Sequence, residues 1–115
     1  RLPSMEKKSL TALARNQLQI AGEASSGRSA QTVYGGSEHV LRQTVIALSA
    51  GFILDEHDNP GEATIHVLKG RVRLLAEGHS WEGSAGDLLI VPQARHSLEA
   101  VEDSAVLLTV AKLDR

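Results

Sequence analysis

Residues 51–70 have the sequence GFILDEHDNPGEATIHVLKG, and residues 86–96 have the sequence GDLLIVPQARH. Both stretches contain short apolar runs bounded by glycine, proline and acidic residues, which is typical of short strands and turns. In the first stretch, Lys69-Gly70 separates the β-rich run 63–68 from another at 71–76. Because glycine accepts a positive φ, this pair predicts a tight hairpin.

Further short β-rich runs lie on both sides of these two stretches. Together they predict about eight strands, among them residues 40–49, 63–68, 71–76, 81–82, 87–91, 96–101 and 105–112. The acidic segment 55–62 is predicted to be a loop. Strands spaced at about 8–12 residues without intervening helices favour an antiparallel sandwich or barrel over parallel βαβ units. The sequence therefore predicts a small all-β domain.

The N-terminal part has a different pattern. Its apolar residues follow helical spacing over residues 9–21, at Leu10, Leu13, Ala14, Leu18 and Ala21. Ser9 is positioned to cap the start of this helix, and Gly22 or Gly27 to end it. The polar stretch 23–29 is predicted to be a linker. We therefore expect residues 1–27 to form an N-terminal helix and linker, and residues 28–115 to form the β domain.

The composition excludes several classes of protein. The chain has 115 residues, 42% of them hydrophobic and 23% charged, so it is not a disordered chain. With no cysteine, it has no disulfides, thiolate zinc sites or cysteine nucleophile. Its net charge of -2 gives no electrostatic drive toward nucleic acid. We expect a cytoplasmic protein that binds neither nucleic acid nor membranes, because the sequence has no apolar run long enough to cross a bilayer and no signal peptide.

The two stretches quoted above resemble the paired motifs of the cupin superfamily, in particular its small RmlC-like members. Gly51, five residues and then His57, with Gly70 at the end, resemble the first cupin motif; Gly86, Pro92 and His96 resemble the second. The resemblance covers residues 40–112 and implies a cupin-type β-barrel, or jelly roll, preceded by the N-terminal helix. It also implies a pocket inside the barrel and, in many members, a bound transition metal.

Two of the four usual metal ligands of the family are replaced. Asn59 stands where the pattern has its second histidine, and Ala63 stands where it has a glutamate. The resemblance carries over only His57 and His96, and two imidazoles alone bind a divalent metal weakly. Glu62 lies one residue out of register, and only a β-bulge would turn it inward. We therefore expect no cofactor, or a weakly bound divalent transition metal.

The expected pocket is lined by His57, Asn59, His96 and Gln43. Gln43 has two interpretations that stay open: a polar group inside the barrel, or a hydrogen-bonded strand residue. If Ala63 points inward, the alternation of a strand also sends Ile65 and Val67 inward, which makes the interior apolar.

Three functions are compatible with these residues. The leading hypothesis is a module that binds a small molecule in an apolar barrel pocket with a degenerate metal site. The second is a metal-dependent cupin enzyme, of the dioxygenase or isomerase type, that uses His57 and His96 with Asn59 or Glu62. The third is a metal-free isomerase with His96 as the general base.

The expected partners are a small-molecule ligand and a second copy of the chain. The resemblance implies a homodimer, and we expect outward Ile46, Leu48 and Leu68 to contribute to its interface.

Overall fold

The computed structural model describes residues 5–57 and 61–112, with Glu56 and His57 described by their backbone only. In these ranges the chain forms one helix and nine strands: α1 (Leu10–Glu23), β1 (Arg28–Tyr34), β2 (Leu41–Leu48), β3 (Ile53–His57), β4 (Gly61–Lys69), β5 (Arg71–Ala76), β6 (His79–Ser84), β7 (Leu88–Ile90), β8 (His96–Ala100) and β9 (Ser104–Lys112). Six of these strands, β2, β4, β5, β7, β8 and β9, closely match predicted ones.

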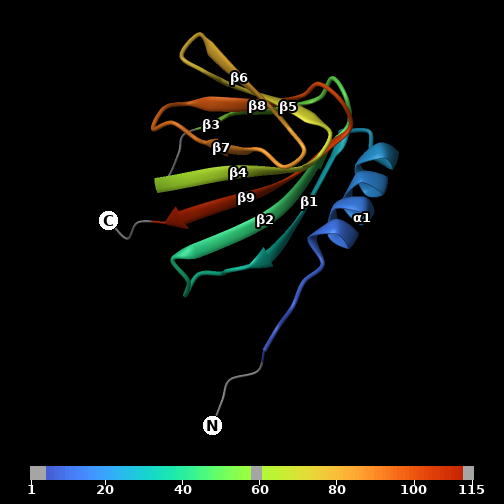
Figure 1. Cartoon of the computed structure of the whole chain (residues 1–115), viewed down its shortest axis with the longest axis vertical. Helices are drawn as coiled ribbons and strands as arrows, with labels where there is room; N and C mark the ends of the chain where they lie inside the picture. The colour runs from blue at the N-terminus through green and yellow to red at the C-terminus, as the bar shows by residue number, and fades with distance from the viewer. Residues whose placement is uncertain (1–4, 58–60, 113–115) are drawn as a thin grey trace.

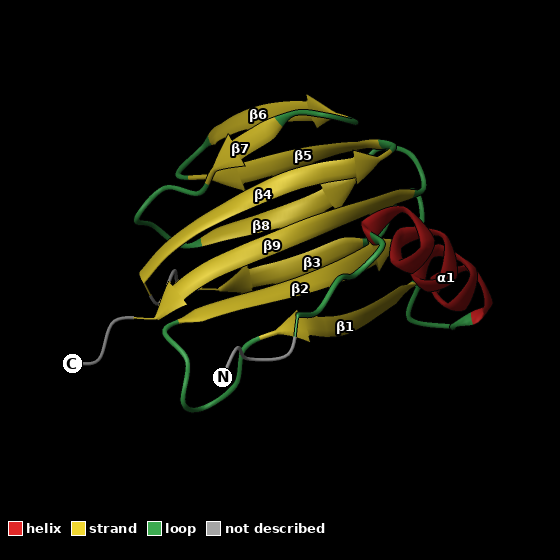
Figure 2. Cartoon of the chain, turned by 60° about the horizontal axis from the view of Figure 1, so that its bottom comes forward, coloured by secondary structure: helices red, strands yellow, loops and turns green. Residues whose placement is uncertain are grey.

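The strands form two antiparallel sheets that pack face to face as a jelly roll (Figure 1). The five-stranded sheet has the order β1-β2-β9-β4-β7, and the four-stranded sheet has the order β3-β8-β5-β6. The two layers and the flanking helix are also visible in Figure 2. The fold class predicted from the sequence, a small antiparallel β-barrel with an N-terminal helix, is confirmed.

The core lies between the two sheets and is aliphatic. On β4, Ala63, Ile65 and Val67 alternate inward as predicted, and all three are buried. They pack against side chains from the other strands: Ile46, Leu48, Val72, Leu74, Val91, Leu98, Ala100 and Val106. Because each fully buried aliphatic side chain contributes about 1.5–3 kcal/mol, this layer holds the sheets together.

The second half of strand β2, Val45 to Leu48, is buried on both of its faces. Ile46 and Leu48 belong to the core between the sheets, so their predicted outward orientation is wrong. Leu68 does lie outside, in a hollow that it shares with residues of α1. Val45 and Ala47 are buried on the outer face of β2, where α1 packs. The helix covers this face, so hydrophobicity alternates little along β2.

Helix α1 begins as predicted and ends later than predicted. The Ser9 hydroxyl accepts a hydrogen bond from the backbone N–H of Ala12, which is an N-cap contact. The helix continues to Glu23, so Gly22 lies inside it rather than ending it. Gly27, with φ +69°, forms the turn into β1. Within the described residues, no helix has the length and apolar content required to cross a membrane.

Two strands lie where the sequence analysis expected irregular structure. Strand β1 starts at Arg28, inside the predicted linker, and pairs with β2 along the edge of the larger sheet. Strand β3 continues to His57, inside the predicted loop 55–62. This second difference matters for the site, because it places His57 in a ladder with β8.

Candidate functional site

His96 opens β8 and points into the barrel. It alternates inward with Leu98 and Ala100, and only 5% of its surface is exposed. Its Nδ1 lies 3.0 Å from the carbonyl oxygen of Ala94. Because a carbonyl oxygen only accepts hydrogen bonds, Nδ1 carries the proton. In the neutral ring Nε2 therefore holds the lone pair that would accept a proton or a ligand donor.

The barrel interior next to His96 is almost filled. A cavity of about 20 Å³ is lined by His96 and aliphatic side chains from both sheets: Ile46, Leu54, Ile65, Leu98, Val106 and Leu108. This volume suits roughly one water molecule, but a buried water needs two or more polar partners, and His96 is the only polar side chain among the described lining residues. The cavity therefore favours a small apolar group, such as a methyl.

A register shift places the backbone of His57 opposite His96. In the β3–β8 ladder, Leu54 pairs with Leu98 and His57 pairs with His96. Between these pairs β3 has one more residue than β8, so the ladder contains a bulge. The two histidines of the sequence motifs are thus direct partners across neighbouring strands. Asn59, the third predicted pocket residue, lies outside the described residues.

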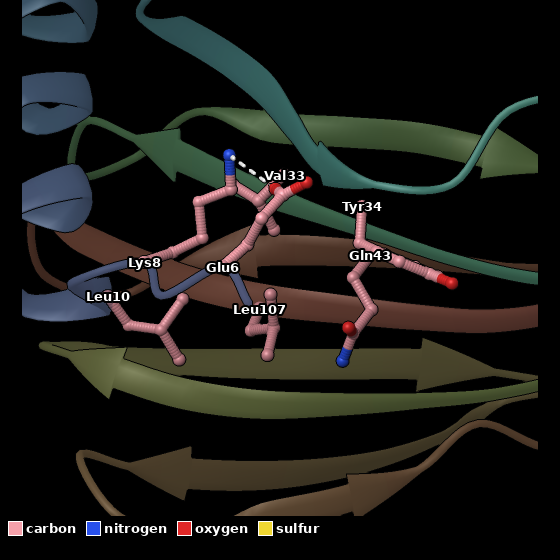
Figure 3. A pocket seen from close by; sticks show the side chains of 7 residues that line it. All are labelled: Glu6, Lys8, Leu10, Val33, Tyr34, Gln43 and Leu107. Carbon is pink, nitrogen blue, oxygen red and sulfur yellow. Dashed lines mark ion pairs between the residues drawn. The ribbon is translucent and has the colours of Figure 1, made fainter. Parts of the chain in front are cut away.

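Gln43 does not belong to this group. Its side chain lies on the outer face of the five-stranded sheet, where its Nε2 donates to Thr109 Oγ1 at 3.2 Å. There it lines a hollow of about 430 Å³ together with residues of β1, β9 and the N-terminal segment (Figure 3). The interpretation as a pocket group inside the barrel is therefore wrong. The alternative, a hydrogen-bonded strand residue, agrees with the structure.

Glu62 is also on the outside. In the β4–β9 ladder Glu62 pairs with Ala111 and Ala63 with Val110, without a register shift at this point. Glu62 is exposed and Ala63 is buried in the core. The bulge that would have turned the Glu62 carboxylate inward is not formed.

The comparisons with known proteins agree with this fold. The cupin domain family matches residues 44–111. This chain belongs to the cupin family. None of the curated proteins compared with it matches.

Solved structures share the cupin fold at low sequence identity. A conserved protein of unknown function from Streptococcus pyogenes is 25% identical, with a TM-score of 0.70 and 80% of each chain covered. A cupin superfamily protein from Desulfitobacterium hafniense is 15% identical, with a TM-score of 0.75, covering 97% of this chain and 95% of that one. The DMSP lyase DddQ from Ruegeria pomeroyi is 21% identical, with a TM-score of 0.62, covering 71% of this chain and 45% of that one.

The donors that the structure describes do not make up a tight metal site. Among residues 5–57 and 61–112, no group of three or more histidine, cysteine, aspartate or glutamate residues is placed to hold a metal ion. His96 supplies one imidazole, Ala63 supplies no donor, and the Glu62 carboxylate lies on the other side of its strand. Transition metals bound through imidazole generally need three or more protein ligands in fixed positions.

The sequence analysis overlooked a third histidine at the same level of the barrel. In the four-stranded sheet, His57 pairs with His96, His96 with Ala76, and Ala76 with His79. His79 is exposed at the start of edge strand β6. The signal was available in the sequence, because the short turn at 77–78 fixes Ala76 and His79 as partners once the hairpin is recognised. This row marks one end of the barrel, which we call the mouth.

Proposed function

We propose that this cupin binds a small molecule at the mouth of its barrel, with the imidazole of His96 as the main polar contact and without a tightly bound metal. The observation that carries the proposal is a buried imidazole whose Nδ1 is held by the Ala94 carbonyl at 3.0 Å. A buried polar group with a fixed tautomer, surrounded by aliphatic side chains, is the usual composition of a small-molecule site.

The chemistry of the site defines the ligand class. An imidazole exchanges hydrogen bonds with hydroxyl and amine groups, so the ligand presents such a group to His96. The cavity beside His96 holds about 20 Å³ and is otherwise aliphatic, so only a methyl-sized part of the ligand enters the barrel beyond the imidazole. His79 stands at the rim in the same row as His96. The proposed ligand is a small hydroxylated or amine-bearing molecule with a short apolar group.

Histidine-selective NMR tests this proposal. The chain has 5 histidines, so labelling them with ¹⁵N gives few and resolvable signals. A panel of small alcohols, sugars and amines is added, and we expect a binder to shift the His96 signals and to raise the melting temperature. The variant His96→Gln should abolish both effects, whereas His66→Gln, on the outer side of β4, should retain them. A binder that acts equally on both variants would contradict the proposal.

A metal-dependent cupin enzyme remains the rival function. The pairing of His57 with His96 favours it, since both histidines of the motifs stand together. It requires further ligands, and Glu62 is not available. DMSP lyase DddQ shows that a protein with this fold can be an enzyme, but at 21% identity its activity does not transfer. Metal analysis of protein purified without a histidine tag separates the two functions.

We also propose that the protein is a homodimer and that it works in the cytoplasm. Two of the three residues expected at the interface, Ile46 and Leu48, lie in the core instead. The support now comes from exposed apolar side chains around the β1–β2 hairpin: Met5, Tyr34, Val40 and Leu41. A patch of this kind at a free sheet edge is a common site of subunit contact.

A further inference from the structure

Two free sheet edges meet on one side of the barrel. Strand β6 ends the four-stranded sheet and β7 ends the five-stranded sheet. The two strands contact each other, and Figure 2 shows them as neighbours. In the described part of the chain, β6 pairs only with β5 and β7 only with β4. We call the gap between β6 and β7 the seam.

The two strands of the seam pack closely at Gly83 and leave a pocket at Trp81. At Gly83 of β6, an added Cβ would lie only 3.2 Å from Leu89 Cδ1 of β7, so the strands approach closely there. Trp81 lies two residues before Gly83 on β6. At the level of Trp81 the two strands leave a pocket of about 270 Å³. All of its lining side chains are apolar: Leu74, Trp81, Leu88, Leu89 and Ile90.

The pocket presents an aromatic surface to solvent. Trp81 is 47% exposed, and the lining residues Leu88 and Ile90 are 58% and 68% exposed. The His79 imidazole lies beside the indole, with ring centroids 6.2 Å apart and an interplanar angle of 43°. The site shares no lining residue with the cavity beside His96. The pocket is therefore distinct from the cavity beside His96, although His79, at the rim of the ligand site proposed above, lies next to Trp81.

We propose that the seam binds the planar aromatic ring of a small molecule, stacked on Trp81 and bordered by Leu88, Leu89 and Ile90. A cavity of roughly 150 Å³ holds a benzene ring, so the volume here suits a ring system of one or two fused rings. Indole is a large stacking surface for such a ring. The apolar lining selects against charged groups, which stay at the rim where water is available.

Trp81 provides a direct measurement, because it is the only tryptophan of the chain. The probe is anilinonaphthalene sulfonate, whose fused rings carry one charged group. We expect saturable binding of one probe per chain, accompanied by energy transfer from Trp81 to the probe. The protein must show native near-ultraviolet circular dichroism, since partly unfolded chains also bind this dye.

Two matched variants locate the site. Ile90→Glu places a carboxylate at the pocket, and we expect it to weaken probe binding by at least about tenfold. Ile53→Glu makes the same change at a 46% exposed position on β3, the opposite edge of the four-stranded sheet, and should leave binding unchanged. If Ile90→Glu does not fold, Leu88→Glu gives the same test.

Three results would overturn the proposal. The first is the lack of saturable binding to the native protein. The second is binding without energy transfer from Trp81, or binding that Ile53→Glu reduces as much as Ile90→Glu. The third is a combination of two measurements: light scattering gives Ile90→Glu half the mass of the wild-type protein, and the wild-type protein binds the probe more weakly as the protein concentration rises. This last result would make the seam an interface between two copies of the chain.

Discussion

The side chain at position 63 determines whether strand β4 supplies a carboxylate ligand for a metal inside the barrel. Ala63 is buried where the cupin pattern has a glutamate. We expect purified protein to contain well under one equivalent of any transition metal, and its melting temperature to change little with chelator. A metal bound at about a hundred times its dissociation constant would add about 2.7 kcal/mol, which is several degrees in a domain of this size.

The control for this prediction restores the family pattern. The double variant Asn59→His, Ala63→Glu supplies the two missing donors, so added zinc should raise its melting temperature. Stoichiometric metal in the wild-type protein, measured by mass spectrometry, would contradict the prediction and favour the enzyme function.

Single residues differ in how far the sequence predicts them. His96 could be placed because the spacing Gly86, Pro92, His96 fixes where β8 begins. The orientation of Gln43 could not be predicted, because its strand is buried on both faces over Val45 to Leu48 and alternation then gives no signal. Contact with α1 determines which face of β2 lies on the outside of the barrel, and a local sequence pattern does not show such a tertiary contact.

Among the elements, strands β1 and β3 show the limit of local patterns. Strand β1 is polar and mostly exposed along its length, so it resembles a linker in composition. Strand β3 ends in the acidic sequence Asp55-Glu56-His57, which resembles the loop that follows it. Both strands lie at a sheet edge, and pairing with a single neighbour stabilises them. Strands β4 and β5 were predictable because apolar alternation and a short turn define them, and β9 because it is a short apolar run that follows a turn.

Helix α1 covers the outer face of β2 and β9, and its removal is a test of the domain division. Without residues 1–27, buried side chains on this face become exposed: Val45, Ala47, Ala105 and Leu107. We expect the barrel to keep its fold but to lose on the order of 3 kcal/mol of unfolding free energy. Circular dichroism and thermal melting check this, and an unfolded spectrum would show that the helix is integral to the domain.

Two substitutions within α1 give the same test without truncation. Ala21→Asp buries a charge against the sheet, because Ala21 is 1% exposed, and should destabilise the protein strongly. Ala12→Asp makes the same change on the exposed side of the helix and should cost under about 1 kcal/mol.

The outer face of the four-stranded sheet has a charge network that predicts a pH effect. Arg73 donates to Glu82 and Glu99, each at 2.9 Å. The hydrogen bond from Arg73 holds the pKa of Glu82 below its usual value, and Arg71 adds to this. A lowered pKa in the folded state stabilises the protein above the unfolded-state pKa, and this contribution is lost as the pH falls through the folded value.

We therefore expect Glu82→Gln to melt at a lower temperature than wild type at pH 7, with the difference shrinking in acid. The effect should be small and should weaken in high salt, since the pairs are partly exposed. Glu62→Gln, at an exposed position on the other sheet, is the control. A difference between Glu82→Gln and wild type that stays constant down to pH 2 would contradict the role of this carboxylate.

The whole molecule is expected to be a dimer through the β1–β2 hairpin. Light scattering at micromolar concentration should give twice the mass of one chain. Val40→Lys places a charge in the exposed patch and should shift the protein toward the monomer, while Ile53→Lys should not. A wild-type monomer at this concentration would remove the role assigned to the patch.

Strand β9 lies in the middle of the five-stranded sheet, between β2 and β4, although it follows all the other strands in the chain. On the ribosome, β2 and β4 are therefore made long before the strand that joins them. Until β9 is made, the edges of β2 and β4 that face it have no partner strand, and such exposed strand edges are prone to aggregation. We expect the nascent chain to stay unfolded until residues 104–112 have left the exit tunnel, and then to fold in a single step. Premature termination within β9 would leave β2 and β4 without the strand that joins them, and we expect such a chain to hold little of the structure.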